Sequence, residues 1–239
     1  MPGSLSAVSV GVEGFGVAGV GARLVAYLLD SLIWTTVPYV LAIFALDWAD
    51  LIRFAVAASA TGSSATYAIP ISLNLVLLAA ISIAISYAYF VGWWSGGHQA
   101  TPGMRLLGMR VIDADTQRTL TLGAATRRWV ILGAPFSFLG LVAPLQVVAT
   151  IVSSLLPLVL LLTTLASDRR QGLHDRWANS IVIRSRSSGI GRTAFGCIVY
   201  IVLTTAIFAV LFGIMIVTVG PLFVPLIEDL RLQMPSTPA

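Results

Sequence analysis

Two ionisable side chains near the start of the sequence, Arg23 and Asp30, are candidates for ion or proton chemistry. Asp30 lies inside an apolar segment, where an ionised carboxylate costs about 2.5–3.5 kcal/mol on membrane-insertion scales. Arg23 stands nearly two helical turns earlier, so both side chains share a helix face about 10 Å apart and cannot touch. Asp30 therefore needs another partner: the amide of Asn74, a hydroxyl of the second apolar segment, or an arginine of a basic loop.

Two roles are open for Asp30. The carboxyl group either bonds a neighbouring helix and fixes the packing, or binds an ion or a proton during transport. Polar residues within membranes serve both purposes, so the sequence alone favours neither role.

The densest charge cluster of the sequence runs from Asp168 to Arg176 and includes His174 and Asp175. We interpret it as a cap at the membrane surface, where arginines meet lipid headgroups and aspartates neutralise them, in preference to a catalytic site. His174 is expected to be exposed and to titrate near neutrality. No second histidine stands at a metal-binding spacing, so no metal site and no cofactor are predicted.

Sequence patterns of enzymes are weak. Residues 14–19 read Gly-Phe-Gly-Val-Ala-Gly and match the dinucleotide-binding pattern, but no strand is predicted before them and an apolar segment follows, so we reject that interpretation. No nucleophile and base fall at a usable spacing, and the single cysteine, Cys197, lies inside an apolar stretch. We do not expect an enzyme.

The composition indicates a membrane protein. Hydrophobic residues make up 57% of the chain and charged residues only 10%, whereas soluble domains carry about 25% charged residues. A net charge of +4 is compatible with nucleic-acid binding, but the arginines cluster beside apolar segments, where they hold loops on the cytoplasmic face. We therefore expect the lipid bilayer as partner, with anionic headgroups at the arginine-rich loops, and no nucleic acid.

Five apolar segments approach the roughly 20 residues that cross a hydrocarbon core of about 30 Å. They cover residues 24–46, 68–94, 129–147, 149–166 and 193–219. The third and fourth are predicted to form a membrane hairpin, because prolines and glycines divide one long apolar stretch. A first half that is re-entrant or lies at the interface is the alternative.

The segments divide the chain into four parts. Residues 1–20 are predicted to be a flexible N-terminal segment and residues 21–184 the main membrane domain. A linker and the last span occupy residues 185–219, and residues 220–239 form a short tail.

Two arginine-rich loops, residues 95–128 and 167–192, flank the predicted hairpin. Alternating residues over 109–122 predict a short β-hairpin, and residues 180–184 form a further β-like run. Pairing of these runs would put both loops on one side, which the positive-inside rule makes the cytoplasm, together with the N-terminus. The predicted fold class is an all-α polytopic membrane protein of about five helices with a small cytoplasmic β-hairpin.

Three blocks of sequence occur in a familiar order: residues 21–30 (GARLVAYLLD), 100–111 (ATPGMRLLGMRV) and 172–180 (GLHDRWANS). Together they resemble the RDD family of bacterial membrane proteins, which is named for one Arg and two Asp. The resemblance maps these onto Arg23, Asp30 and Asp175. The family usually has a basic residue where Met104 stands, and Gly-Thr at positions 179–180.

The resemblance implies a multi-pass protein of the bacterial plasma membrane, and a role in transport has been proposed for the family. Our leading hypothesis is transport of an ion or small ligand, most concretely cation–proton exchange. Asp30 and Asp175 would then be the ligands and Arg23 a positioning charge. The supporting residues would be Asn74, His174 and Arg176.

The alternative is a scaffold or assembly subunit that transports nothing. Its arginine-rich loops would bind anionic lipid or a cytoplasmic partner. A homo-oligomer or a membrane-protein partner fits either function, because about five short spans leave little room for an enclosed pathway.

Overall fold

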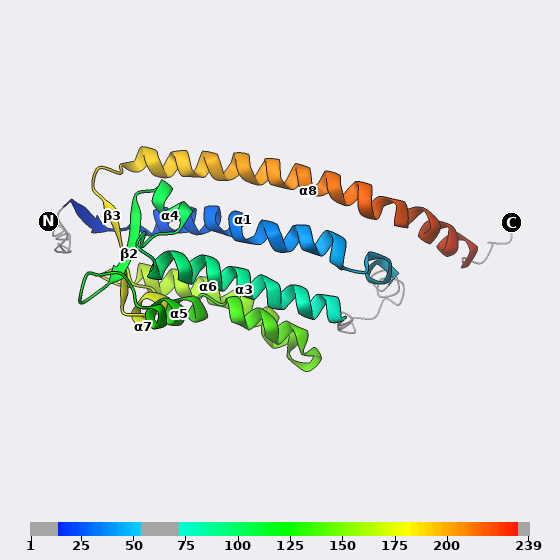
Figure 1. The fold of residues 1–239 in the computed structure, drawn as a ribbon, viewed down its shortest axis with the longest axis horizontal. Helices are drawn as coiled ribbons and strands as arrows, with labels where there is room; N and C mark the ends of the chain where they lie inside the picture. The colour runs from blue at the N-terminus through cyan, green and yellow to red at the C-terminus, as the bar shows by residue number, and fades with distance from the viewer. Residues whose placement is uncertain (1–13, 54–71, 234–239) are drawn as a thin grey trace.

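The computed structural model describes residues 14–53 and 72–233. Among these residues, four helices are long and apolar enough to cross a membrane: α1 (Val20–Ala45), α3 (Leu73–Ser95), α6 (Gln146–Leu165) and residues Ile190–Pro225 of α8 (Ile190–Gln233). α1 packs against α3 and α8, and the long helices run along one another (Figure 1). Large apolar side chains such as Phe44 and Phe208 stay exposed on them, as expected for helices that face lipid.

A small antiparallel sheet closes one end of the helical bundle (Figure 1). Its strand order is β1 (Phe15–Val17), β3 (Ser180–Ser185) and β2 (Met109–Asp113), so the last strand in sequence lies in the centre. Val182 of β3 pairs with Val111 of β2. Three short helices belong to the same end: α4 (Pro102–Leu106), α5 (Leu122–Ile131) and α7 (Leu173–Trp177).

The buried core sits where α1 meets the sheet. Ala22 and Ala26 lie four residues apart on α1, so their small side chains share one helix face and let neighbouring backbone approach closely; Ala18, which precedes the helix, is buried as well. Trp94, at the end of α3, and Val182, in the central strand, are buried in the same cluster. The sheet and the first turns of α1 therefore form one packed unit.

Threonine caps determine where the two short helices α4 and α5 begin. Thr101 accepts a hydrogen bond from the Met104 amide at 3.4 Å, and Thr121 accepts one from the Ala124 amide at 3.2 Å. Such caps satisfy backbone N–H groups that have no partner within the helix. They fix both helices at the ends of the first basic loop.

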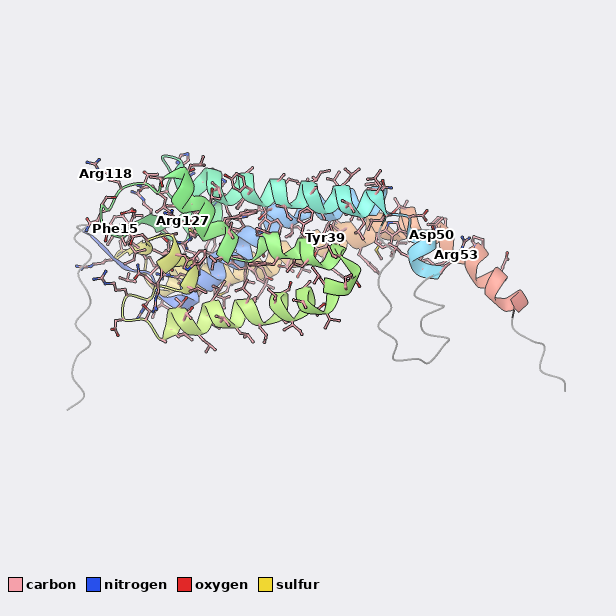
Figure 2. The ribbon with its side chains drawn as sticks, turned by 90° about the horizontal axis from the view of Figure 1, so that it is seen from below. Phe15, Tyr39, Asp50, Arg53, Arg118 and Arg127 are labelled. Carbon is pink, nitrogen blue, oxygen red and sulfur yellow. The ribbon has the colours of Figure 1, made fainter. Side chains whose placement is uncertain are left out.

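The predicted span over residues 129–147 is not a continuous helix, so the described residues hold four candidate spans, not five. α5 ends at Ile131, Gly133 adopts φ +102°, and two short 3-10 helices follow, η1 (Ala134–Leu141) and η2 (Ala143–Leu145). The left-handed glycine and the prolines that follow it break the α-helical hydrogen-bond pattern. α6 then doubles back (Figure 2), so the two halves of the stretch run as a hairpin, but its first arm is shorter than predicted and forms no candidate span.

The predicted β-hairpin over residues 109–122 is wrong, whereas the pairing between the two basic loops is confirmed. β2 forms its ladder with β3, and its one backbone hydrogen bond to residues 118–122 runs from the Asp113 amide to the Arg118 carbonyl oxygen at 2.9 Å. Asp113 instead closes a turn by accepting hydrogen bonds from the amides of Asp115 and Thr116 at 3.1 and 2.9 Å. Thr121 is then used as the cap of α5, and residues 118–120 form no strand.

Two terminal predictions also need correction. Residues 15–17 form β1 and Ala18 is buried, so the flexible segment predicted over 1–20 does not extend that far; residues 1–13 lie outside the described part. The last helix continues to Gln233 through Pro221 and Pro225. Pro221 and Pro225 therefore lie inside α8, and the helix does not end at residue 219 as predicted.

Candidate functional site

Asp175 lies at the centre of an ionic cluster at the sheet end, and its side chain is fully buried. Arg23 donates to Oδ2 of Asp175 at 2.8 Å, and Arg128 forms a second ion pair with Oδ1. The Gly172 amide and the Ser180 hydroxyl add hydrogen bonds to the same carboxylate at 3.2 and 3.3 Å. We refer to Arg23, Arg128, His174, Asp175 and Ser180 as the Asp175 cluster.

Separate elements bring the members of the Asp175 cluster together. Arg23 projects from the first turns of α1, Arg128 from the last turn of α5, and Asp175 from α7. Asp175 is the third residue of α7. At this position its carboxylate accepts a hydrogen bond from the Gly172 amide at the start of the helix, which has no partner within the helix. β3 begins soon afterwards and supplies Ser180, so the α7–β3 connection positions both acceptor and hydroxyl.

Arg23 also fastens α1 to the sheet. Its guanidinium donates to the carbonyl oxygens of Val182 and Ala18, both at 3.3 Å. Arg128 has a different environment: its guanidinium carbon lies 4.8 Å from the centroid of the Trp94 ring and its Nη1 donates to Ser180 at 2.8 Å. Both arginines are therefore held by several contacts, and each contributes one charge to the carboxylate between them.

The charges of the cluster determine its protonation. Burial of Asp175 opposes its ionisation, but the positive charges of Arg128 and Arg23 and the Gly172 amide outweigh that effect and lower the carboxyl pKa to about 2. Burial lowers the pKa of His174 to about 4, and the attraction of Asp175 only partly offsets it. Near neutral pH the cluster therefore holds two guanidinium ions, one carboxylate and a neutral imidazole.

Asp30 belongs to a second site, nearly two helical turns beyond Arg23 along α1. Three donors reach its carboxyl group: the Tyr89 hydroxyl at 2.8 Å, the Thr101 hydroxyl at 2.5 Å and the Gly103 amide at 2.8 Å. The first comes from α3 and the others from the start of α4. Asp30 thus joins three helices, and its buried oxygens have their hydrogen bonds from the protein itself.

Gly103 permits this contact because it has no side chain. A Cβ atom at this position would lie 2.5 Å from the Ala26 carbonyl oxygen and 2.9 Å from Oδ1 of Asp30. Both distances are far shorter than carbon–oxygen contacts allow, so α4 can approach α1 this closely only with glycine. The block of residues 100–111 is therefore shaped to receive the carboxyl group of Asp30.

The supporting residues proposed from the sequence have different fates. His174 lies in the Asp175 cluster, but it is mostly buried with a lowered pKa, so the prediction of an exposed imidazole that titrates near neutrality is wrong. Asn74 is exposed at the far end of α3 and does not bond Asp30; Tyr89, a hydroxyl of the same segment, does. Arg176 points to the exposed surface beside the cluster.

Sequence reasoning did not single out Arg128, Thr101 or Ser180. Arg128 was grouped with the surface arginines, and the only local signal was its position directly before the apolar stretch. Thr101 precedes Pro102, a sequence typical of the start of a helix, and that cap is the element that meets Asp30. Within the described residues, no group of three or more His, Cys, Asp or Glu side chains could hold a metal ion.

A cavity of about 200 Å³ lies between the Asp175 cluster and Asp30. One side is polar, with Arg23, Arg128 and His174 in its wall, and Asp30 at its deeper part. The remaining lining is largely apolar and comes from α1, α3, α4, α6, the end of α5 and the strand β3, with Leu160, Leu161 and Thr164 among the residues of α6. The cavity therefore offers charged groups next to apolar walls, as small-molecule sites commonly do.

The described residues thus combine four candidate membrane-spanning helices, a small sheet at one end and a buried Arg–Asp cluster, the features of a helical membrane protein. The model of the RDD family matches residues 17–179, which include Arg23, Asp30 and Asp175, and the chain belongs to this family of membrane proteins. No curated protein and no solved structure matches the chain. α8, from Ile190, lies beyond the region that the family model matches.

Proposed function

We propose that this RDD-family protein binds a small anionic ligand in the cavity between the Asp175 cluster and Asp30, and carries it across the membrane. The observation that supports this most directly is the set of unused donors in the cavity wall. Arg128 Nε, His174 Nδ1 and Trp94 Nε1 are buried nitrogens without a hydrogen-bond partner, and all three residues line the cavity. Arg128 and Trp94 can act only as donors there.

The carboxylate in the cavity wall, Asp30, and the neighbouring carboxylate of Asp175, in contrast, already have their partners. Asp175 accepts from two arginines, an amide and a hydroxyl, and Asp30 accepts from two hydroxyls and an amide. A cation would have to displace these donors, whereas an anion supplies the acceptors that Arg128 and Trp94 lack. This favours transport of a small anionic ligand over cation–proton exchange. Asp30 and Asp175 then act as positioning residues.

The charge distribution supports an orientation with the sheet end in the cytoplasm. Nine exposed arginines belong to the loops and helix ends around the sheet: Arg105, Arg110, Arg118, Arg127, Arg169, Arg170, Arg176, Arg186 and Arg192. At the other end, Nη1 of Arg53 lies 3.6 Å from Oδ1 of Asp50, so the charges of these two side chains cancel (Figure 2). Positive loops are retained in the cytoplasm, so the cavity would lie near that membrane surface.

A thermal-stability panel tests the proposal. The purified protein is heated with sodium benzoate, benzenesulfonate, acetate or phosphate, and with sodium or potassium chloride at matched ionic strength. We expect one or more organic anions to raise Tm in a concentration-dependent way, because a ligand that binds only the folded state stabilises it. Sodium and potassium chloride should have no such effect.

Two neighbouring variants make the panel specific for the cavity. Leu161 lines the cavity, whereas Leu162 is 62% exposed on the outer face of α6. Leu161→Trp should remove the response to anions, and Leu162→Trp should keep it. Equal responses of both variants and the unchanged protein, or a response to sodium alone, would overturn the proposal.

A scaffold function is the second candidate, and the exposed arginines favour it. They could bind anionic lipid headgroups without any ligand in the cavity, each contributing about 1 kcal/mol near a charged surface. Flotation of soluble protein partners with vesicles that contain the protein would support this function. The anion panel would then show no change for any variant.

A further inference from the structure

Beside the cavity just described lies a second cavity of about 250 Å³, farther along the apolar helices. It is bounded by α1, α3, η1 and α6, and aromatic and aliphatic side chains such as Trp34, Phe136 and Leu156 dominate its wall. Tyr27, Phe90, Leu132 and Pro157 line both cavities, so the two are neighbours that share one wall. We call them the head cavity, near Arg128, and the tail cavity, near Trp34.

Size suggests that the two cavities are used together. Small-ligand sites occupy about 300–1,000 Å³, and neither cavity reaches that range alone at about 200 and 250 Å³. Taken as one site they do. The combined site would carry charged side chains at one end and none at the other, in the direction of α1 from Arg23 to Trp34, a distance of about 16 Å.

We propose that the ligand is a single-chain amphiphile whose carboxylate or phosphate head meets Arg128 and Trp94 in the head cavity while its alkyl chain fills the tail cavity. This inference rests on the function proposed above and adds the ligand class. The head needs acceptor atoms, because buried N–H donors lack partners there. The tail cavity has no charged side chain in its wall, and apolar and aromatic side chains make up most of it, although the unpartnered Nε1 of Trp34 and three serines also lie there.

The surroundings of the site fit a ligand that arrives from the bilayer. α6 separates both cavities from its own exposed apolar face, where Leu158 and Leu162 stay accessible. The polar head would sit at the end with the exposed arginines, where lipid headgroups also lie. An amphiphile already oriented in one leaflet would therefore present its head and chain in the order that the two cavities require.

One carboxyl group in the wall, that of Asp30, and one beside the wall, that of Asp175, oppose an anionic head, whereas two arginines of the wall favour it. Asp30 and Asp175 repel an anion, but their oxygens are occupied by protein donors. Arg23 and Arg128 attract it, and Arg128 is 97% buried, where its charge is little screened. His174 contributes no charge near neutral pH. The balance at the head cavity therefore selects an anion over an alkylammonium ion of equal chain length.

Quenching of tryptophan fluorescence by bromine tests this placement. The full-length protein in phospholipid nanodiscs is titrated with 12-bromododecanoate, with 2-bromododecanoate and with 12-bromododecyl phosphate. The bromine at the chain end should quench Trp34 and Trp129, which both line the tail cavity. The saturable part of the quenching should therefore fall in Trp34→Phe and disappear when Trp129→Phe is added, whereas in Trp94→Phe its amplitude should stay and only the affinity should drop. Bromine next to the head should give the reverse pattern. The phosphate arm shows which of the two heads binds more tightly.

A matched pair of serines on α6 provides the control. Ser153 lines the tail cavity and its neighbour Ser154 does not. Ser153→Phe should weaken binding of 12-bromododecanoate at least tenfold, and Ser154→Phe should leave it unchanged. 12-Bromododecyltrimethylammonium, which enters the bilayer but carries the opposite charge, should give no saturable quenching.

The outcomes separate this inference from the function proposed above. If benzoate still raises Tm while quenching is linear and unaffected by Ser153→Phe, the anion site stands and the amphiphile is excluded. If neither benzoate nor any brominated chain produces a saturable, cavity-dependent response, both proposals fail. Saturable quenching that follows Trp34 and Ser153 supports the amphiphile.

Discussion

The guanidinium of Arg23 lies 2.8 Å from the carboxylate of Asp175, although 152 residues separate them in the chain. This ion pair fastens the loop after α6 to the start of α1. Asp30, farther along α1, fastens the loop after α3 through Thr101 and Gly103. The three residues for which the family is named thus attach both basic loops to one helix, and the cavity lies between the two attachments.

Replacing the central carboxylate should destabilise the protein strongly. Asp175→Asn leaves Arg23 and Arg128 buried without their counter-ion, and loss of one partner of a buried ion pair costs about 3–5 kcal/mol. We expect a large fall in Tm of the purified protein and less protein in the membrane. Asp168→Asn, an exposed substitution in the same loop, should change stability by less than about 0.5 kcal/mol. Equal stability of the two variants would exclude a central role for Asp175.

Stability should fall as the pH drops from 6.5 to 4, because of His174. The unfolded chain binds a proton at this residue below about pH 6.5, whereas burial lowers the folded pKa to about 4 even though Asp175 attracts the proton. The contribution is therefore fully present above pH 6.5 and lost towards pH 4. One pKa unit corresponds to about 1.4 kcal/mol, so the loss approaches about 3 kcal/mol.

Tm measured across this pH range checks the assignment. His174→Gln should flatten the profile, and His98→Gln, at an exposed position, should keep it. Asp175 does not contribute in this window, because its pKa of about 2 keeps it ionised. A profile that His98→Gln flattens and His174→Gln does not would place the titrating group elsewhere.

Two glycines in equivalent positions give a test of the Asp30 contact. Gly103 and Gly123 are each the second residue of a short helix that follows a threonine cap. A Cβ at Gly103 would overlap Ala26 and Asp30, whereas nothing lies within 4 Å of one at Gly123. Gly103→Ala should cost about 1–3 kcal/mol, as overpacking does, and Gly123→Ala should be close to neutral in a Tm comparison. Similar Tm values would mean that α4 is free to move away from α1.

Cysteine labelling in intact cells tests the orientation. In a Cys197→Ala background, single cysteines at Thr116 and Ser187 report on the sheet end and one at Asp50 on the opposite end; all three positions are exposed. With the sheet end in the cytoplasm, an impermeant reagent should label position 50 in intact cells and positions 116 and 187 only after lysis. Labelling of 116 and 187 from outside would reverse the orientation.

The sequence predicts the membrane segments better than the site, because apolar length is a local property and side-chain pairing is not. Residues 24–46 and 149–166 correspond closely to α1 and α6. The prediction of a span over residues 129–147 is wrong, because 3-10 turns at Gly133 and the prolines take the place of the predicted α-helix. Residue composition does not reveal that replacement.

The Asp175 cluster needed the fold. From the sequence, an arginine at the border of an apolar segment is as well explained by contact with lipid headgroups as by a buried ion pair. Only the β2–β3 pairing brings the two basic loops close enough for Arg128 to reach Asp175. The partners of Asp30 are easier to predict, because a buried carboxyl group needs hydrogen-bond donors and Tyr89 carries one of the hydroxyls of the second apolar segment.

Transport by reconstituted protein tests the central claim most directly. Proteoliposomes are loaded with a pH-sensitive dye, and either a sodium gradient or a gradient of radiolabelled benzenesulfonate, which keeps its charge at all pH values used, is imposed. The account predicts uptake of the anion that is abolished in Leu161→Trp and retained in Leu162→Trp, with no sodium-dependent proton movement. Sodium-dependent proton flux that disappears in a well-folded Asp30→Asn variant, without anion uptake, would contradict it and restore cation–proton exchange.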